Sequence, residues 1–233
     1  MKTYGLSERQ LAAVAAKNHC HSVHNPFSQY RAAMTIDEVL AARRVAWPLT
    51  LPMCSPISDG AAAAIVCNQQ GLARFKKRRG IRVLASVLAS SSDRECADLD
   101  RHITRLAATR AYELAGVGPE DMSLAEVHDA TAFGEILQSE CLRFCAFGDG
   151  GQLAESGATR LGARIPINVS GGLESKGHPI GATGLAQLVE LVIQLRGEAG
   201  PRQVRGARFA IAENGGGFDE VEEAAASVTI LAS

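Results

Sequence analysis

The chain has 233 residues, of which 46% are hydrophobic and 21% charged, with a formal net charge of −1. This length suits one large domain or one and a half ordinary ones, with enough apolar material for a core. The balanced charge gives no reason to expect nucleic acid or an anionic membrane as the main partner. No apolar stretch approaches the roughly 18 residues of a membrane-spanning helix, and residues 1–17 lack a secretory signal core, so we predict a cytoplasmic protein.

The N-terminal third predicts short helices joined by irregular chain. Residues 7–18 have the pattern of an amphipathic helix that Ser7 can cap, and Thr35 starts a second, shorter helix. The polar residues 19–30 predict a loop. After a proline-punctuated extended stretch, the apolar run 61–66 predicts a buried strand.

A basic, turn-rich segment at 71–80 predicts a domain boundary, with 1–79 as one unit and 80–233 as the other. The run Lys76-Lys77-Arg78-Arg79 favours a solvated linker, and the alternative is a contact with the phosphates of a ligand. Beyond it, strands alternate with helices, which predicts an α/β sheet protein. The expected strands are 81–88, 123–127, 165–169, 208–212 and 225–231, and the expected helices are 103–115, 133–144 and 184–195.

Cysteines and histidines give no metal or disulfide pattern. The six cysteines contain no CxxC pair, so we expect mostly buried thiols in a reducing compartment. His19, His21 and His24 are closely spaced but lack a fourth ligand, so a solvated loop is favoured over a metal site. His102 is expected on a helix surface. We therefore predict no bound metal.

The most informative segment is 168–184, where five glycines in 17 residues separate a predicted strand from a predicted helix. Glycine permits positive φ and close approach of the backbone to a ligand. The segment surrounds His178, which Pro179 follows, and a histidine held on such a loop can exchange a proton near neutral pH. An incidental histidine in a turn is the alternative, which the full pattern disfavours.

Residues 168–184 resemble the catalytic histidine motif of the thiolase superfamily, and the continuation to Gly200 is similar to thiolases of the sterol carrier protein X type. Three further segments fit in order: 56–64 resembles a strand near the end of the family's N-terminal domain, 126–129 its HDCF motif, and 213–217 its last catalytic loop. The resemblance implies a thiolase-like fold, a mixed β-sheet with helices on both faces, comprising the C-terminal half and the tail of the N-terminal half.

The resemblance also implies roles. His178 would activate a nucleophilic cysteine and help to hold the thioester oxygen. His128 would replace the asparagine that anchors an oxyanion-hole water in other thiolases, and the N–H of Gly215 would contribute to a second oxyanion hole. Such preorganised donors are what a developing enolate or oxyanion requires.

A CoA thioester would be the substrate, without a tightly bound cofactor. Ser55 matches a serine that contacts the pantetheine arm of CoA in relatives, and Gly172 and Lys176 are further candidate CoA-binding residues.

Two departures from the family affect the nucleophile and the acid/base residue. The family's nucleophilic cysteine precedes the segment matched here, and none of the six cysteines occupies its place. The cysteine of HDCF is replaced by Ala130, and that of the C-x-G motif by Glu213. Glu213 could act as a base if burial raised its pKa, and otherwise it is a solvated or ion-paired carboxylate. Asp129 either orients His128 or, as we favour, caps the helix that follows it.

Three functions remain open. The first is a thiolase-family acyltransferase that forms or cleaves the C–C bond of a 3-oxoacyl-CoA, with its nucleophilic cysteine on a separate subunit or an earlier segment. The second is a non-catalytic fragment or a partner subunit of a heteromeric thiolase. The third is a retro-aldol lyase that acts on a β-hydroxyacyl-CoA with a small acyl-CoA-binding partner. An uncovered strand at 61–66 would favour a homo- or hetero-oligomer or poor solubility.

Overall fold

The computed structural model describes residues 1–75 and 79–233, so most of the basic run lies outside the described residues. A four-stranded sheet has the order β3-β6-β5-β4, with β3 at Arg82–Ser90, β6 at Ala225–Ala232, β5 at Phe209–Gly216 and β4 at Leu124–Glu126. The β3–β6 and β6–β5 pairs are antiparallel and the β5–β4 pair is parallel. This confirms the predicted mixed sheet.

Helices cover both faces of this sheet. Side chains alternate along a strand, so Ile211 of β5 packs in the cluster under α4 (Ile103–Ala115), while Ala210 and Ala212 pack in the cluster under α8 (Thr183–Leu195). The predicted end of α4 is confirmed, because Gly116 adopts a left-handed φ of 66° and caps it.

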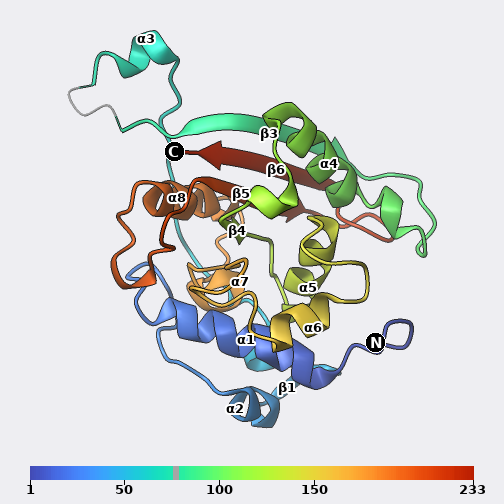
Figure 1. Cartoon of the computed structure of the whole chain (residues 1–233). Helices are drawn as coiled ribbons and strands as arrows, with labels where there is room; N and C mark the ends of the chain where they lie inside the picture. Colours follow the sequence, from blue (N-terminus) through green and yellow to red (C-terminus); the bar gives the residue numbers. More distant parts are fainter. Residues whose placement is uncertain (76–78) are drawn as a thin grey trace.

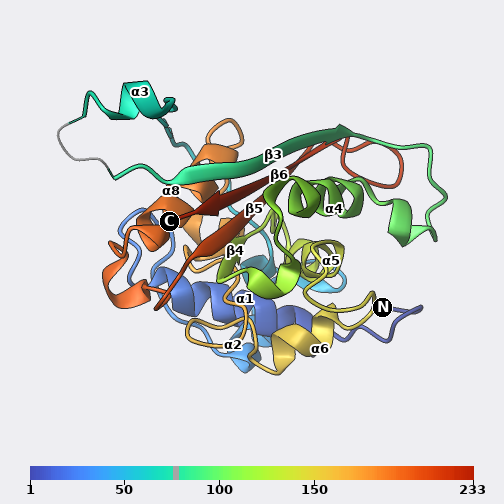
Figure 2. The ribbon, with the colours of Figure 1, turned by 45° about the horizontal axis from the view of Figure 1, so that its top comes forward.

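A helical layer lies on the opposite side of the molecule from the sheet (Figures 1 and 2). It contains α1 (Glu8–Ser22) and α2 (Ile36–Ala41), with α5 (Ala132–Cys141), α6 (Gly150–Glu155) and α7 (Gly172–Lys176) packed against α1. A small hairpin joins β1 (Arg44–Ala46) to β2 (Leu49–Thr50). Capping boxes at Ser7 and Thr35 confirm both predicted helix starts. None of the described helices is long and apolar enough to span a membrane.

A buried polar network fixes α1 to the rest of the chain. The Lys17 ammonium lies 2.8 Å from a Glu135 carboxylate oxygen and donates to the Ile167 carbonyl at 2.7 Å, and both charged side chains are almost fully buried. The Asn18 amide nitrogen, with two hydrogens, contacts the carboxylates of Asp129, Glu135 and Glu174 at 3.0, 3.1 and 2.9 Å. Burial raises the pKa of Asp129 and Glu174 well above their usual range. Each of these two carboxyl groups therefore keeps its proton to a higher pH than an exposed carboxyl group does.

Two predicted strands are corrected. Residues 61–66 form no helix or strand and lie at the surface, with Ile65 81% and Val66 86% exposed. No described strand pairs with them, and they lead to α3 (Gln69–Leu72) on an arm that extends from the body (Figure 1). The predicted strand at 165–169 is reduced to one parallel bridge, from Ile167 to Ala125.

Three histidines are more buried than predicted. Helix α1 continues to Ser22, so His19 and His21 belong to a buried helix and not to a solvated loop. His21 donates from Nδ1 to the Asn168 carbonyl and accepts from the Leu161 N–H, both at 3.0 Å. His102 is 1% exposed at the N-terminus of α4. Polar residues with fixed partners fit inside the fold, which apolar periodicity cannot indicate.

We predict that Lys17→Met lowers the free energy of unfolding by about 3–5 kcal/mol, because it leaves the Glu135 carboxylate buried without its cation. Urea denaturation followed by circular dichroism measures this. The exposed Lys2 provides the control, since Lys2→Met should change stability by less than about 0.5 kcal/mol. The double variant Lys17→Met/Glu135→Gln removes the charge but keeps a side-chain oxygen for the amides of Asn18 and Asn168, so it should recover part of the loss. No recovery would contradict the ion-pair explanation.

Candidate active site

Two histidines from distant parts of the chain face each other. His128 follows β4 and His178 follows α7, and their ring centroids are 4.9 Å apart with the planes nearly perpendicular. Burial, and then the neighbouring His178, lowers the pKa of His128 to about 4. Burial, and then Lys176, also lowers the pKa of His178. Both imidazoles are therefore neutral at pH 7, as proton acceptance or hydrogen-bond donation without a fixed charge requires.

The segment 54–58 links the two histidine loops. The Ser55 N–H donates to the Ala130 carbonyl at 2.9 Å, next to His128. Further along, Ile57 forms a bridge with His178, and the His178 N–H donates to the Ser58 hydroxyl at 3.2 Å. An open hollow of about 450 Å³ lies beside this junction, lined by 58–62 and 179–182. The structure thus brings Ser55, His128 and His178 into one region.

The hydroxyl of Thr183 sets the proton position on His178. The Pro179 carbonyl can only accept, so the Thr183 hydroxyl donates its hydrogen to it at 3.1 Å. The same oxygen lies 2.7 Å from Nδ1 of His178, and it must therefore accept from that nitrogen. A neutral imidazole with its proton on Nδ1 has a free lone pair on Nε2. His178 can consequently take up a proton at Nε2.

Contacts of His128 come from two consecutive residues of β5. Its Nδ1 lies 3.2 Å from the Asn214 amide nitrogen, and its main-chain N–H donates to a Glu213 carboxylate oxygen at 2.9 Å. Successive strand residues face opposite sides of a sheet, so the two contacts hold His128 from different directions. Gly215, further along β5, pairs with Ala226, and a Cβ there would lie 2.6 Å from Glu223.

Glu213 is neither solvated nor ion-paired, which corrects one of its two interpretations. It is 0% exposed, and burial raises its pKa to about 8. One carboxylate oxygen accepts from His128, and the other has no hydrogen-bond partner among the described residues. Burial thus raises the pKa of Glu213, as its action as a base would require, and that action stays a prediction.

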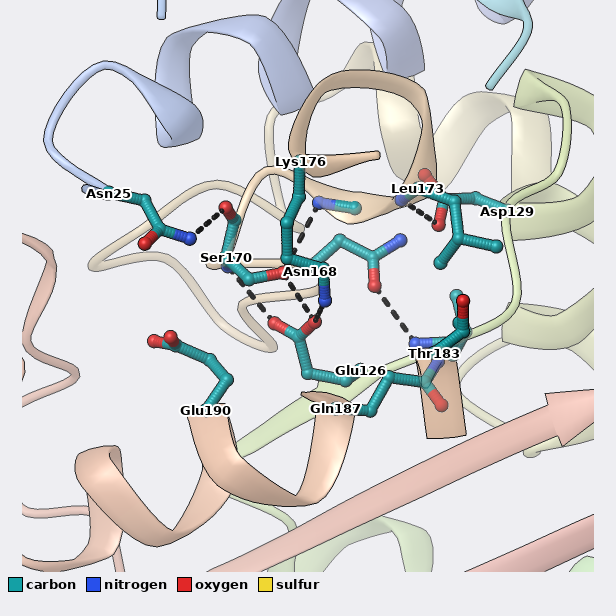
Figure 3. A network of polar contacts seen from close by, with 12 residues as sticks. Asn25, Glu126, Asp129, Asn168, Ser170, Leu173, Lys176, Thr183, Gln187 and Glu190 are labelled. Carbon is teal, nitrogen blue, oxygen red and sulfur yellow. Dashed lines mark hydrogen bonds and ion pairs between the residues drawn. The ribbon is translucent and has the colours of Figure 1, made fainter. Parts of the chain in front are cut away.

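Gly172 and Lys176 lie on the inner side of the segment 168–184, in a buried polar network. Figure 3 shows Lys176 in this network. The Lys176 ammonium lies 3.7 Å from Glu126, whose carboxylate accepts from the Ser170 N–H and hydroxyl at 3.0 and 2.6 Å. Gly172 has a φ of 61°, and a Cβ there would overlap the Asp129 carboxylate. Both residues thus face the interior of the protein.

Asp129 caps a helix, but not the one that follows it. Its carboxyl group accepts from the N–H of Leu173 at 2.7 Å (Figure 3) and from the N–H of Glu174 at 3.4 Å, both in the first turn of α7. The helix after it, α5, has no side-chain cap from Thr131. Orientation of His128 comes from Asn214, so both interpretations of Asp129 were wrong. A carboxylate can cap any helix end brought close by the fold.

The thiols whose pKa shifts are resolved are poor nucleophiles. Burial raises the pKa of Cys54, of Cys141 and, to about 12, of Cys145. Reactive cysteines have lowered pKa values, because the thiolate is the nucleophile. Within the described part of the chain, no hydrogen bond joins a thiol to either histidine of the pair.

The sequence prediction missed three residues that contact the histidines or support them: Thr183, Gln187 and Asn214. Thr183 lies in the glycine-rich segment itself, five residues after His178. Asn214 sits between two predicted site residues, so its position was a usable signal. Gln187 lies on a predicted helix with no local cue.

We predict that Glu213 makes stability fall as pH rises. Its folded pKa of about 8 exceeds the usual 4.5, so its stabilisation is fully present below pH 4.5 and is lost as pH rises through about 8. Between pH 5 and 8 the free energy of unfolding should fall by up to about 1.4 kcal/mol per pH unit from this group. Urea midpoints across this range should show a shallower slope for Glu213→Gln. The exposed control Glu95→Gln should retain the wild-type slope, and equal slopes for all three proteins would contradict the assignment.

Comparison with known proteins identifies the family of the chain. Residues 85–232 match the thiolase C-terminal domain-like family. The chain is 44% identical over 226 residues to an acetyl-CoA acetyltransferase of Methanothermobacter thermautotrophicus, covering 93% of this chain and 57% of the relative. It is 41% identical over 225 residues to sterol carrier protein 2 of Rattus norvegicus, covering 92% and 40%.

A third relative is benzoylsuccinyl-CoA thiolase subunit BbsB of Thauera aromatica, 37% identical over 204 residues, covering 86% of this chain and 52% of the relative. The chain thus spans about half the length of these relatives. The solved structure of an Ltp2–ChsH2(DUF35) aldolase shares the fold, with a TM-score of 0.80 at 20% identity, covering 100% of this chain and 60% of the other. The family match extends over most of the chain, which therefore belongs to the thiolase family and carries that family's C-terminal domain.

Proposed function

We propose that this chain supplies the thioester-activating part of a thiolase-family acyltransferase, which forms or cleaves the C–C bond of a 3-oxoacyl-CoA. The observation that carries the proposal is the pair of neutral imidazoles of His128 and His178, with ring centroids 4.9 Å apart. The relatives named as an acetyl-CoA acetyltransferase and a benzoylsuccinyl-CoA thiolase subunit support it.

In the cleavage direction, the free Nε2 of His178 accepts the proton of a nucleophilic thiol. The thiolate adds to the 3-oxo carbon, and the bond between carbons 2 and 3 breaks. The acyl group stays on the thiol, and the released acyl-CoA leaves as an enolate that takes up a proton. His128 and the N–H of Gly215 are assigned to the oxygens that become negative in these steps. Transfer of the acyl group to CoA completes the cycle.

The nucleophilic thiol is proposed to come from outside the described residues, on another segment or another subunit. The resolved thiol pKa values are raised, and the chain spans about half the length of its relatives. One relative is named as a subunit, which supports a heteromeric arrangement. The exposed apolar residues Ile65 and Val66 favour a partner that covers them.

Ser55 is the proposed contact for the pantetheine arm of CoA, because it lies beside the His128 loop. Gly172 and Lys176 belong to this proposal as residues that hold the His178 loop in place, since both lie in the buried network. CoA takes part as a substrate.

A retro-aldol lyase is the second candidate, and the raised pKa values of Cys54, Cys141 and Cys145 favour it, because this reaction needs no thiol. Nε2 of His178 would accept the proton of a β-hydroxyl group, and the C–C bond would break to a carbonyl compound and an acyl-CoA enolate. The enolate would then recover the proton from His178. The solved structure that shares this fold is named an aldolase, which is the same class of reaction, and its name lists two proteins, Ltp2 and ChsH2. A small acyl-CoA-binding partner would fit the same pattern.

Exchange of α-protons tests the part of the proposal that needs no thiol. A saturated acyl-CoA incubated with the chain in D2O should incorporate deuterium at carbon 2, because both reactions pass through an enolate. His178→Asn should slow this exchange by about 100-fold or more. His24→Asn, at an exposed position, should leave it unchanged. Exchange by the wild type at the rate of buffer alone, with acyl-CoA bound, would favour a non-catalytic subunit and contradict the proposal.

Product analysis separates the two reactions. An acyltransferase should cleave a 3-oxoacyl-CoA in the presence of CoA once a thiolase N-terminal half carrying the cysteine is added, and iodoacetamide should then inactivate it. A lyase should cleave a β-hydroxyacyl-CoA without added thiol and should resist iodoacetamide.

A further inference from the structure

The tautomer of His128 is set by a chain of amide contacts that begins at a main-chain carbonyl. The Glu213 carbonyl oxygen, which can only accept, lies 3.0 Å from the side-chain amide of Gln187. The contacting atom must therefore be the Gln187 nitrogen. This fixes the orientation of the Gln187 amide and turns its oxygen toward Asn214.

The same constraint passes to the next amide. The Gln187 oxygen lies 3.1 Å from Asn214, whose contacting atom must be its nitrogen, because two carbonyl oxygens cannot share a hydrogen bond. That nitrogen has a second hydrogen, and it lies 3.2 Å from Nδ1 of His128. Nδ1 therefore accepts, and the proton of the neutral ring must reside on Nε2.

We propose that Asn214 and Gln187 are positioning residues that hold His128 as the Nε2–H tautomer, so that its free ring edge is a hydrogen-bond donor. The inference rests on the proposed function only for its effect on catalysis, since the tautomer is a property of the folded chain itself. His178 has the opposite tautomer through Thr183, with a free lone pair on Nε2. The pair thus offers one donor and one acceptor.

Burial makes this orientation stable. Gln187 is 0% exposed, so water cannot replace its partners. Rotation of the Gln187 amide would place its oxygen against the Glu213 carbonyl, and rotation of the Asn214 amide would place two oxygens together. Gly184, in the first turn of α8, lies next to the Asn214 side chain: a Cβ added at Gly184 would be 3.5 Å from the Asn214 amide carbon.

The tautomer can be read directly by NMR of the chain labelled with ¹⁵N-histidine, because a bare and a protonated ring nitrogen resonate in separate regions. His128→Asn identifies the His128 signals by their disappearance. In the wild type, Nδ1 of His128 should be bare and Nε2 protonated. A wild-type spectrum with the proton on Nδ1 would overturn the inference without any variant.

Two substitutions test the cause. Asn214→Asp has the same shape but presents an acceptor to the ring, so the proton of His128 should move to Nδ1. Gln187→Met removes the contact that orients Asn214, so a mixture of tautomers should appear. The exposed Gln152→Met provides the matched control and should leave the spectrum unchanged. An unchanged tautomer in Asn214→Asp would overturn the inference, and this variant at a partly exposed site carries the test if Gln187→Met does not fold.

Catalysis gives a separate readout. Asn214→Asp should lower the rate constant for α-proton exchange by about 100-fold, with little change in the half-saturating acyl-CoA concentration, because the oxyanion donor is lost while binding groups remain. A correct tautomer with no exchange in the wild type would refute the proposed function alone. Exchange that persists in a variant with the reversed tautomer would refute the role of Asn214 alone.

Discussion

Desolvation of polar groups between the helical layer and the loop at 168–184 is the constraint on which this structure depends. Charged side chains lose water when buried, and only fixed partners offset that loss. Lys17 meets this requirement with Glu135 and the Ile167 carbonyl, and Asn18 does so with three carboxyl groups. Because these partners come from four separate segments, α1 cannot shift without leaving a buried charge or donor unsatisfied.

The same constraint reaches the histidine pair. Asp129 of the His128 loop receives the first-turn N–H groups of α7, and α7 leads directly into His178. The Asp129 carboxyl group therefore connects the two loops through α7. The segment 54–58 connects them a second time, through its contacts with Ala130 and His178. These contacts fix the main chain of both loops, and the side chains of Thr183 and Asn214 then orient the two rings. Preorganisation of this kind lets a hydrogen-bond donor act in a reaction without first moving.

Much of this was predictable from the sequence, for identifiable reasons. The helix caps at Ser7, Thr35 and Gly116 depend only on neighbouring residues, so the sequence could predict them. The alternation of strands with helices predicted the sheet. The glycine-rich segment around His178 and the resemblance at His128 gave the pair. Contacts between distant residues were missed, because no local pattern encodes that Asp129 meets α7 or that Gln187 meets Asn214. The strand predicted at 61–66 failed for a related reason, since an apolar run becomes a strand only where another strand can pair with it.

The parallel pairing of β4 with β5 has one more consequence. Glu126 lies opposite Ala212 at the end of this pair, so His128 and Asn214 each stand two residues beyond the same rung. His128 and Asn214 therefore meet because the two segments have the same number of residues beyond the last paired position. A single-residue insertion or deletion after Glu126 would bring the wrong neighbour opposite the imidazole, even with every side chain of the site retained. The site therefore depends on the number of residues between Glu126 and His128, as well as on the side chains that meet there.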